Sequence, residues 1–133
     1  MPRLSDRVGT FTDSVIRRMT RINNQYDSIN LSQGFPDFDP PKELTDALAK
    51  AAHDGPHQYA VTFGAQNFRE ALAKKTSPAL HHEVDPNTEI CVTCGGTEAM
   101  MAAMMTICNP GDKVMVFSPF YENYGADAIL SGG

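Results

Sequence analysis

The sequence predicts an α/β fold, namely the front part of a larger domain that contains a mostly parallel sheet. Apolar residues recur at helical spacing in the first two thirds of the chain, and the last third reads as strand, helix and strand. A crossover of this length predicts a right-handed βαβ unit with parallel strands. Because such a unit normally belongs to a larger sheet, we expect further strands beyond this stretch to complete it.

Composition limits the function classes. The chain has 133 residues, of which 41% are hydrophobic, enough for one small domain or part of a larger one. A net charge of -5 with 11 Lys plus Arg argues against a nucleic-acid or membrane-surface partner. The N-terminus lacks the apolar run of a signal peptide, and Asp6 and Asp13 argue against a transit peptide. Three cysteines do not form a disulfide framework, so we expect a cytoplasmic protein.

The first half of the chain predicts three helices and one long loop. Residues 12–24 form an amphipathic pattern, with apolar positions on one side and a solvated face of arginines on the other. Residues 28–41, "SINLSQGFPDFDPP", contain too much Pro, Gly and Asp for regular structure and predict an extended loop. Helices are predicted over residues 41–55, from a first-turn proline to a glycine, and over residues 66–76. The apolar positions of the first helix are Val15, Ile16, Met19 and Ile22, and its arginines are Arg17, Arg18 and Arg21.

The second half predicts the βαβ unit. Residues 77–88 are expected to be a loop. Strands are predicted over residues 89–93 and 113–118, with a helix over residues 97–108 between them. Four methionines lie at helical spacing and predict core packing rather than a cofactor site. They are Met100, Met101, Met104 and Met105.

The CxxC spacing of Cys91 and Cys94 invites a metal or redox interpretation. A strand would point these two side chains to opposite faces, and no second cysteine or histidine pair follows at ligand spacing. A thioredoxin-like motif would be expected at a helix start instead. We therefore predict buried or half-buried strand cysteines and no metal site.

The turn after this strand is more informative. Gly95 and Gly96 lie at the carboxyl end of a predicted parallel strand, and Thr97 opens the next helix. Amides at a helix start have no partner within the helix, so they can bind a phosphate or carboxylate. The alternative is that the glycines only form a tight turn and Thr97 only caps the helix. Neither a GxGxxG nor a Walker motif is present.

Four motifs together resemble the amino-terminal third of a fold-type I, pyridoxal-phosphate-dependent class I/II aminotransferase. They are "NLSQGFPDFDPP", "HQYAVTFGAQNFREALA", "VTCGGTEAM" and "NPGDKVMVFSPFYENY". The nearest branch is that of kynurenine, glutamine and methionine aminotransferases. The resemblance covers nearly all of the chain from Asn30. It implies an N-terminal helix and substrate-side loop over residues 1–40, followed over residues 41–133 by the beginning of the large, cofactor-binding domain.

The resemblance implies a role for several residues. Gly96 and Thr97, with Gly95 shaping the turn, match the loop that holds the phosphate of pyridoxal 5'-phosphate. Tyr121 matches the aromatic residue that stacks on the pyridine ring, although Phe120 is an alternative. The proline next to them, Pro119, matches one often found in the cis form.

Two further residues match positions outside this loop. Tyr59 matches a tyrosine that reaches the cofactor phosphate of the neighbouring subunit, so the resemblance implies a homodimer with shared active sites. The alternative is an ordinary core or interface tyrosine. Gly34 matches a residue of the loop near the substrate's α-carboxylate, although only its backbone conformation could matter.

Transamination between an amino acid and a 2-oxo acid also needs a Schiff-base lysine, an acidic partner for the pyridine nitrogen and an arginine. The resemblance places all three beyond Gly133, so the chain contains no catalytic residue. We expect the lysines present to be surface residues and the chain alone to be inactive. Two alternatives remain, a non-catalytic remnant that binds phosphate weakly and a pyridoxal-phosphate-dependent β-lyase. The lysines are Lys42, Lys50, Lys74, Lys75 and Lys113.

Overall fold

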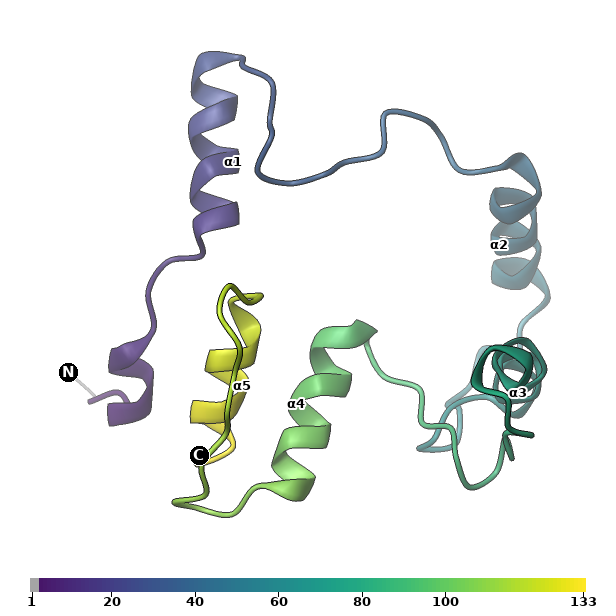
Figure 1. Ribbon diagram of the computed structural model, residues 1–133. Coiled ribbons are helices and arrows are strands. Elements are labelled where there is room, and N and C mark those ends of the chain that lie inside the picture. Colours follow the sequence, from purple (N-terminus) through teal and green to yellow (C-terminus); the bar gives the residue numbers. More distant parts are fainter. Residues whose placement is uncertain (1–2) are drawn as a thin grey trace. The chain divides into compact units, whose positions relative to one another are not determined.

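The computed structural model describes residues 3–133, which fall into two compact units. The terminal unit combines the chain up to Asp39 with Met100–Gly133, and the central unit is Pro40–Ala99. The elements of the described residues are labelled in Figure 1. They are η1 (Asp6–Thr10), α1 (Val15–Tyr26), α2 (Lys42–Asp54), α3 (Gln66–Leu80), α4 (Gly95–Ile107) and α5 (Asn123–Leu130).

Four predicted helices are confirmed as α1 to α4, and the loop between α1 and α2 is irregular as predicted. The structure differs at the end of α3, which continues through Leu80 although Pro78 lies inside it. Since Pro78 is in the last turn, its missing N–H removes only one helical bond. The next residue, His81, caps the helix in the left-handed region with φ 51°. The predicted loop over residues 77–88 therefore begins four residues late.

The predicted strands are not confirmed. Residues 89–93 and 113–118 are irregular, and no strand occurs within residues 3–133. A strand is held by ladder hydrogen bonds to a neighbour, and the described residues supply no such neighbour for either segment. Val92 N–H does donate to the Phe63 carbonyl at 3.0 Å, but this is a single contact.

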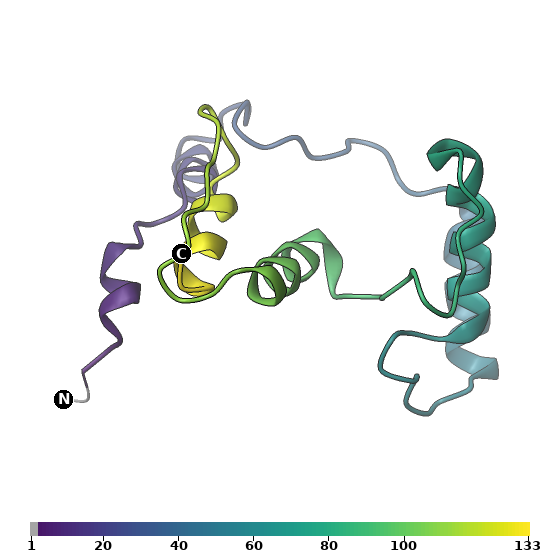
Figure 2. The same ribbon diagram turned by 60° about the horizontal axis from the view of Figure 1, so that its bottom comes forward.

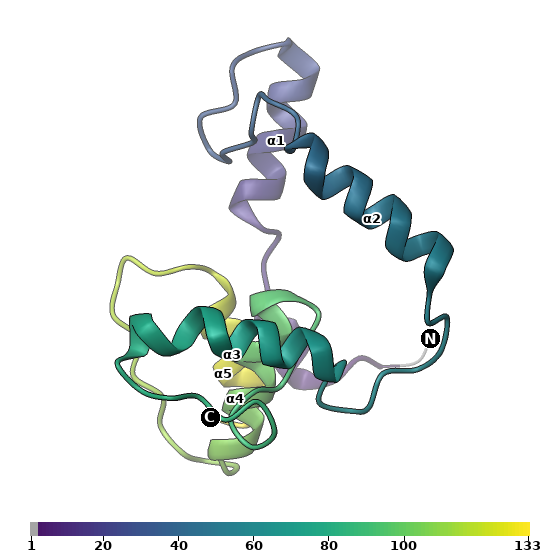
Figure 3. The same ribbon diagram turned by 90° about the vertical axis from the view of Figure 1, so that its right-hand side faces the viewer.

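The central unit is organised around α3, which Figure 3 shows along its length. The guanidinium of Arg69 is buried and donates to the carbonyls of Gly64 at 3.0 Å and Pro86 at 2.5 Å. Arg69 therefore connects the segments before and after α3. Ala73 and Val84 are the buried apolar residues of this unit.

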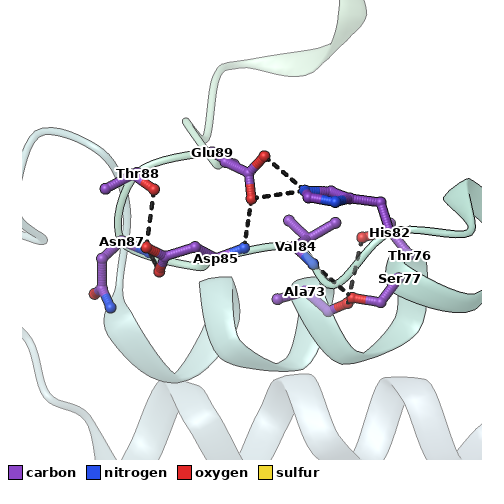
Figure 4. A network of polar contacts seen from close by, with 9 residues as sticks. All are labelled: Ala73, Thr76, Ser77, His82, Val84, Asp85, Asn87, Thr88 and Glu89. Carbon is purple, nitrogen blue, oxygen red and sulfur yellow. Dashed lines mark hydrogen bonds and ion pairs between the residues drawn. The ribbon is translucent and has the colours of Figure 1, made fainter.

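The segment after α3 is held by a polar network, shown in Figure 4. The Ser77 hydroxyl accepts a hydrogen bond from Val84 N–H at 3.0 Å. The Asp85 carboxylate accepts from Asn87 N–H at 2.8 Å, and the Glu89 carboxylate accepts from Asp85 N–H at 2.7 Å. These local bonds fix the chain that leads to residues 90–94, which precede α4.

In the terminal unit, the segment between α4 and α5 returns alongside α5 (Figures 1 and 2). Gly111 N–H donates to the Gly132 carbonyl at 2.8 Å, near the end of α5. Asp127 of α5 is only 3% exposed, and its Oδ2 has no hydrogen-bond partner among the described residues. The elements α5 and η1 were not predicted, because both are short and lack a long apolar periodicity.

Two predictions about burial need correction. Cys91 and Cys94 are exposed rather than buried, because the segment that carries them has no sheet to pack against here. Among the four methionines, Met105 is 63% exposed, while the other three are half-buried. Residues 3–133 contain no cluster of His, Cys, Asp or Glu that could hold a metal ion. None of the helices in that range is long and apolar enough to cross a bilayer.

Candidate functional site

The start of α4 forms a glycine turn. Gly95 has φ +79°, and its N–H donates to the Thr93 carbonyl at 2.8 Å. The Glu98 carboxylate accepts a hydrogen bond from Cys94 N–H and so closes the turn from the side of the helix. The left-handed conformation at Gly95 is one that residues with a Cβ rarely adopt, which explains the first glycine.

This turn fits a phosphate group by the chemistry of its donors. The start of α4 carries the positive end of the helix dipole, which favours an anion there. A Cβ built on Gly96 meets no atom within 4 Å, so the space beside the backbone is open. Gly95, Gly96 and Thr97 are all exposed, as a ligand-binding turn requires. The geometry of the turn is compatible with an anion beside Gly96, and the role of the turn stays a prediction.

Tyr121 lines an open groove of about 440 Å³ within the terminal unit. The walls are mainly apolar and aromatic, which suits the face of a flat ring. The ring of Tyr121 packs edge-on against Tyr124, with centroids 5.9 Å apart and planes at 81°. Phe120 lines the same groove and is 48% exposed, against 49% for Tyr121, so the groove accommodates either assignment. The Ser118–Pro119 bond is cis, as predicted.

The other two assigned residues are exposed. Tyr59 of the central unit is 99% exposed and lines an open cavity of about 640 Å³. Gly34 lies in the irregular loop between α1 and α2, and a Cβ there would meet nothing within 4 Å. The turn of residues 95–97 and Tyr59 belong to the central unit, whereas Tyr121 and Gly34 belong to the terminal unit.

The lysines are all on the surface, as predicted. On α2, Lys42 pairs with Asp46 at 2.6 Å, and Lys50 pairs with Asp54 one helical turn away. Such exposed pairs at i,i+4 are ordinary helix-surface features. None of these ammonium groups lies in the groove that Tyr121 lines.

Contacts around the substrate-side loop were missed from the sequence. The Asn30 side-chain oxygen accepts from Ser32 N–H at 3.0 Å and from Gln33 N–H at 3.3 Å. Its amide nitrogen donates to the Thr20 hydroxyl of α1 at 3.2 Å. An Asn two residues before a Ser is a local signal for such a turn. No such signal exists for Glu122, whose partners lie more than 100 positions away.

Comparison with known proteins gives matches over nearly all of the chain. The family aminotransferase class I and II matches residues 26–133. The methionine aminotransferase of Escherichia coli K12 is 42% identical over 120 residues, which cover 90% of this chain and 31% of that protein. The kynurenine–oxoglutarate transaminase of Dictyostelium discoideum is 35% identical, over 97% of this chain and 30% of that protein.

Solved structures agree with these matches. The structure of Escherichia coli YbdL, identified as having a methionine aminotransferase function, superimposes with a TM-score of 0.90 at 38% identity, over 100% of this chain and 35% of that one. The N-succinyldiaminopimelate aminotransferase of Mycobacterium tuberculosis gives 0.89 at 32% identity, over 98% and 34%. The chain therefore spans about a third of the length of the relatives it matches.

Proposed function

The chain belongs to the aminotransferase class I and II family, which depends on pyridoxal phosphate, and we propose that the whole enzyme moves an amino group from an amino acid to a 2-oxo acid. The observation that carries this proposal is the family match over residues 26–133. The TM-score of 0.90 against a methionine aminotransferase supports it independently. Alone, the chain is proposed to be inactive, since its lysines are surface residues.

Pyridoxal phosphate, when bound, supplies the aldehyde that receives the amino group and a ring that withdraws electrons. The amides of Gly96 and Thr97 would hold its phosphate at the positive end of α4, with Gly95 setting the turn. Tyr121 would cover one face of the ring and shield it from water. The open cradle beside Gly96 and the aromatic wall of the groove support these roles.

Two further residues are proposed to contact a second subunit or the substrate. We propose that Tyr59 contributes to the cofactor phosphate site of a second subunit in a cytoplasmic homodimer, and its 99% exposure leaves it available for that contact. Gly34 is proposed to lie near the substrate's α-carboxylate, in the loop between α1 and α2. Residues 89–93 and 113–118 are proposed to become parallel strands in the whole enzyme, where neighbouring strands complete their ladders.

The substrates follow from the relatives. One is a methionine aminotransferase and another a kynurenine–oxoglutarate transaminase, so we propose methionine and kynurenine as amino donors and 2-oxoglutarate as acceptor. The test is to supply purified whole enzyme with pyridoxal phosphate, each donor and 2-oxoglutarate, and to measure glutamate. We expect glutamate to form with at least one donor. Failure with both donors and with a panel of the common amino acids would overturn the proposal.

A further inference from the structure

We propose that Glu122 is a positioning residue that couples the substrate-side loop, residues 28–41, to the aromatic residue on the cofactor side, Tyr121. Glu122 follows Tyr121 directly and is the N-cap residue of α5. The proposal rests on the function proposed above, because that function gives the loop and Tyr121 their roles. All the contacts that carry it lie within the terminal unit.

The carboxylate of Glu122 binds the start of α1. The Ser14 hydroxyl donates to one carboxylate oxygen at 2.5 Å, and Val15 N–H donates to the other at 3.3 Å. The Glu122 side chain makes no capping bond to its own helix, α5. A carboxylate at a helix start is favoured by the dipole and by the unpaired amides there. Glu122 therefore acts as an extended cap of a helix that lies more than 100 residues earlier in the chain.

The position of Tyr121 is tied to that of Glu122, because the two residues are neighbours in the chain. Tyr124 N–H donates to the Tyr121 carbonyl at 3.0 Å, and the two rings pack edge-to-face. The first turn of α5 thus fixes Tyr121 from one side. Any displacement of this turn moves both the ring of Tyr121 and the carboxylate of Glu122.

Helix α1 is in turn hydrogen-bonded to the substrate-side loop. Thr20 lies six residues after Ser14, about 9 Å along the axis of a rigid helix. Its hydroxyl accepts from the Asn30 amide at 3.2 Å and donates to the Ile16 carbonyl at 3.0 Å, with the Gln33 side-chain oxygen 3.3 Å away. Gln33 directly precedes Gly34. The path from Tyr121 to Gly34 therefore runs through the starts of α5 and α1 and then through Thr20 and Asn30. The Asn30 side-chain oxygen accepts from Gln33 N–H, next to Gly34.

The consequence is specific to substrate binding. If the start of α1 is released from Glu122, the loop has more freedom before substrate arrives, and ordering it costs binding free energy. The loss is the same in the ground state and the transition state, so KM should rise while kcat stays constant.

The experiment uses the whole enzyme with Glu122→Ala, Glu122→Gln and Thr20→Val, and with Glu43→Gln on the exposed surface of α2 as the matched control. We expect Glu122→Ala and Thr20→Val to raise KM for the amino acid about fivefold, the scale of one lost helix-cap interaction. Glu122→Gln keeps an acceptor oxygen and should show a smaller rise. Glu43→Gln should leave KM unchanged.

A second readout does not need activity. In the cofactor-free protein, amide hydrogen exchange of residues 28–36 should become faster in Glu122→Ala and Thr20→Val, and not in Glu43→Gln. Faster exchange in an enzyme that fails to transaminate would uphold the coupling and reject the proposed function. An unchanged loop in Glu122→Ala, or a fall of kcat and cofactor affinity with constant KM, would overturn the coupling itself.

Discussion

The two adjacent glycines at the start of α4 differ in what a side chain would meet. Gly95 has φ +79°, so a Cβ there strains the backbone, whereas a Cβ at Gly96 meets no atom within 4 Å. The space at Gly96 is open in the chain itself, and the proposal places a phosphate there. A substitution at Gly95 should therefore affect folding, whereas a substitution at Gly96 should affect ligand binding.

We predict that Gly96→Ala in the whole enzyme weakens pyridoxal phosphate binding by about tenfold, roughly 1.4 kcal/mol, while the thermal midpoint stays near that of the wild type. Gly95→Ala should instead lower stability by about 1 kcal/mol through its strained conformation. Cofactor titration and thermal unfolding measure the two effects. Wild-type affinity in Gly96→Ala would contradict the placement of the phosphate.

Gly64 is required for a close approach within the central unit. Its φ is +104°, and an added Cβ would lie 2.4 Å from the Val92 Cγ2. We predict that Gly64→Ala destabilises the whole enzyme by about 2 kcal/mol, because the backbone or Val92 must move. Thermal unfolding measures this change. The control is Gly9→Ala, because an added Cβ there would meet no atom within 4 Å. An equal loss of stability in the control would contradict the explanation by contact with Val92.

The stability of the turn after α3 should depend on pH. Hydrogen bonds from Asn87 N–H and the Thr88 hydroxyl lower the pKa of the Asp85 carboxyl, and Asp85 N–H with the His82 ring lowers the pKa of Glu89. A carboxyl whose pKa is lowered in the folded state stabilises the fold at pH values above its unfolded-state pKa of about 4. This stabilisation is lost as the pH falls through the folded-state pKa. Carboxyl titration by NMR should show both values lowered. Thr88→Val should raise the pKa of Asp85, and an unchanged value would contradict this cause.

The helices could be predicted from the sequence, whereas residues 3–133 contain no strand of the predicted sheet. Apolar spacing of three and four residues indicated α1 to α4, since this signal is local. The eight-residue α5 is too short to show such a period. Strand formation depends on neighbours far away in sequence, so the apolar run of residues 114–117 is insufficient by itself. For the same reason, the glycine turn could be predicted as a local motif, whereas the contact of Glu122 with Ser14 could not be predicted from the sequence.

Hydrogen exchange tests the proposed strands directly. In the 133-residue chain, the amides of residues 90–93 and 114–117 should exchange rapidly, because the described residues form no ladder there. Val92 is excepted, since its N–H donates to the Phe63 carbonyl. In the whole enzyme, the same amides should be protected at least about 100-fold by neighbouring strands. The amides of α3 serve as an internal reference, being helical in this chain. Rapid exchange of both segments in the whole enzyme would contradict the βαβ unit.

In the central unit, the apolar face of α2 is exposed. The apolar residues Leu44 and Leu48 of α2 are 63% and 72% exposed. The hydrophobic face that makes α2 predictable from sequence therefore has no partner among the described residues.

We predict that the isolated 133-residue polypeptide unfolds over a broad temperature range and binds pyridoxal phosphate only weakly. The physical reason is that its apolar helix faces contribute little burial, so cooperativity is low. Differential scanning calorimetry and cofactor titration measure both properties. A sharp transition together with micromolar cofactor binding would show that the chain forms its site unaided.

Transamination is tested by following the amino nitrogen itself. Whole enzyme would be given pyridoxal phosphate, methionine or kynurenine with an isotopically labelled amino group, and unlabelled 2-oxoglutarate, and the products would be analysed by mass spectrometry. We predict that the label appears in glutamate, as transamination requires. Label released as ammonia, or retained in the donor, would contradict the assignment of this chain to an active aminotransferase.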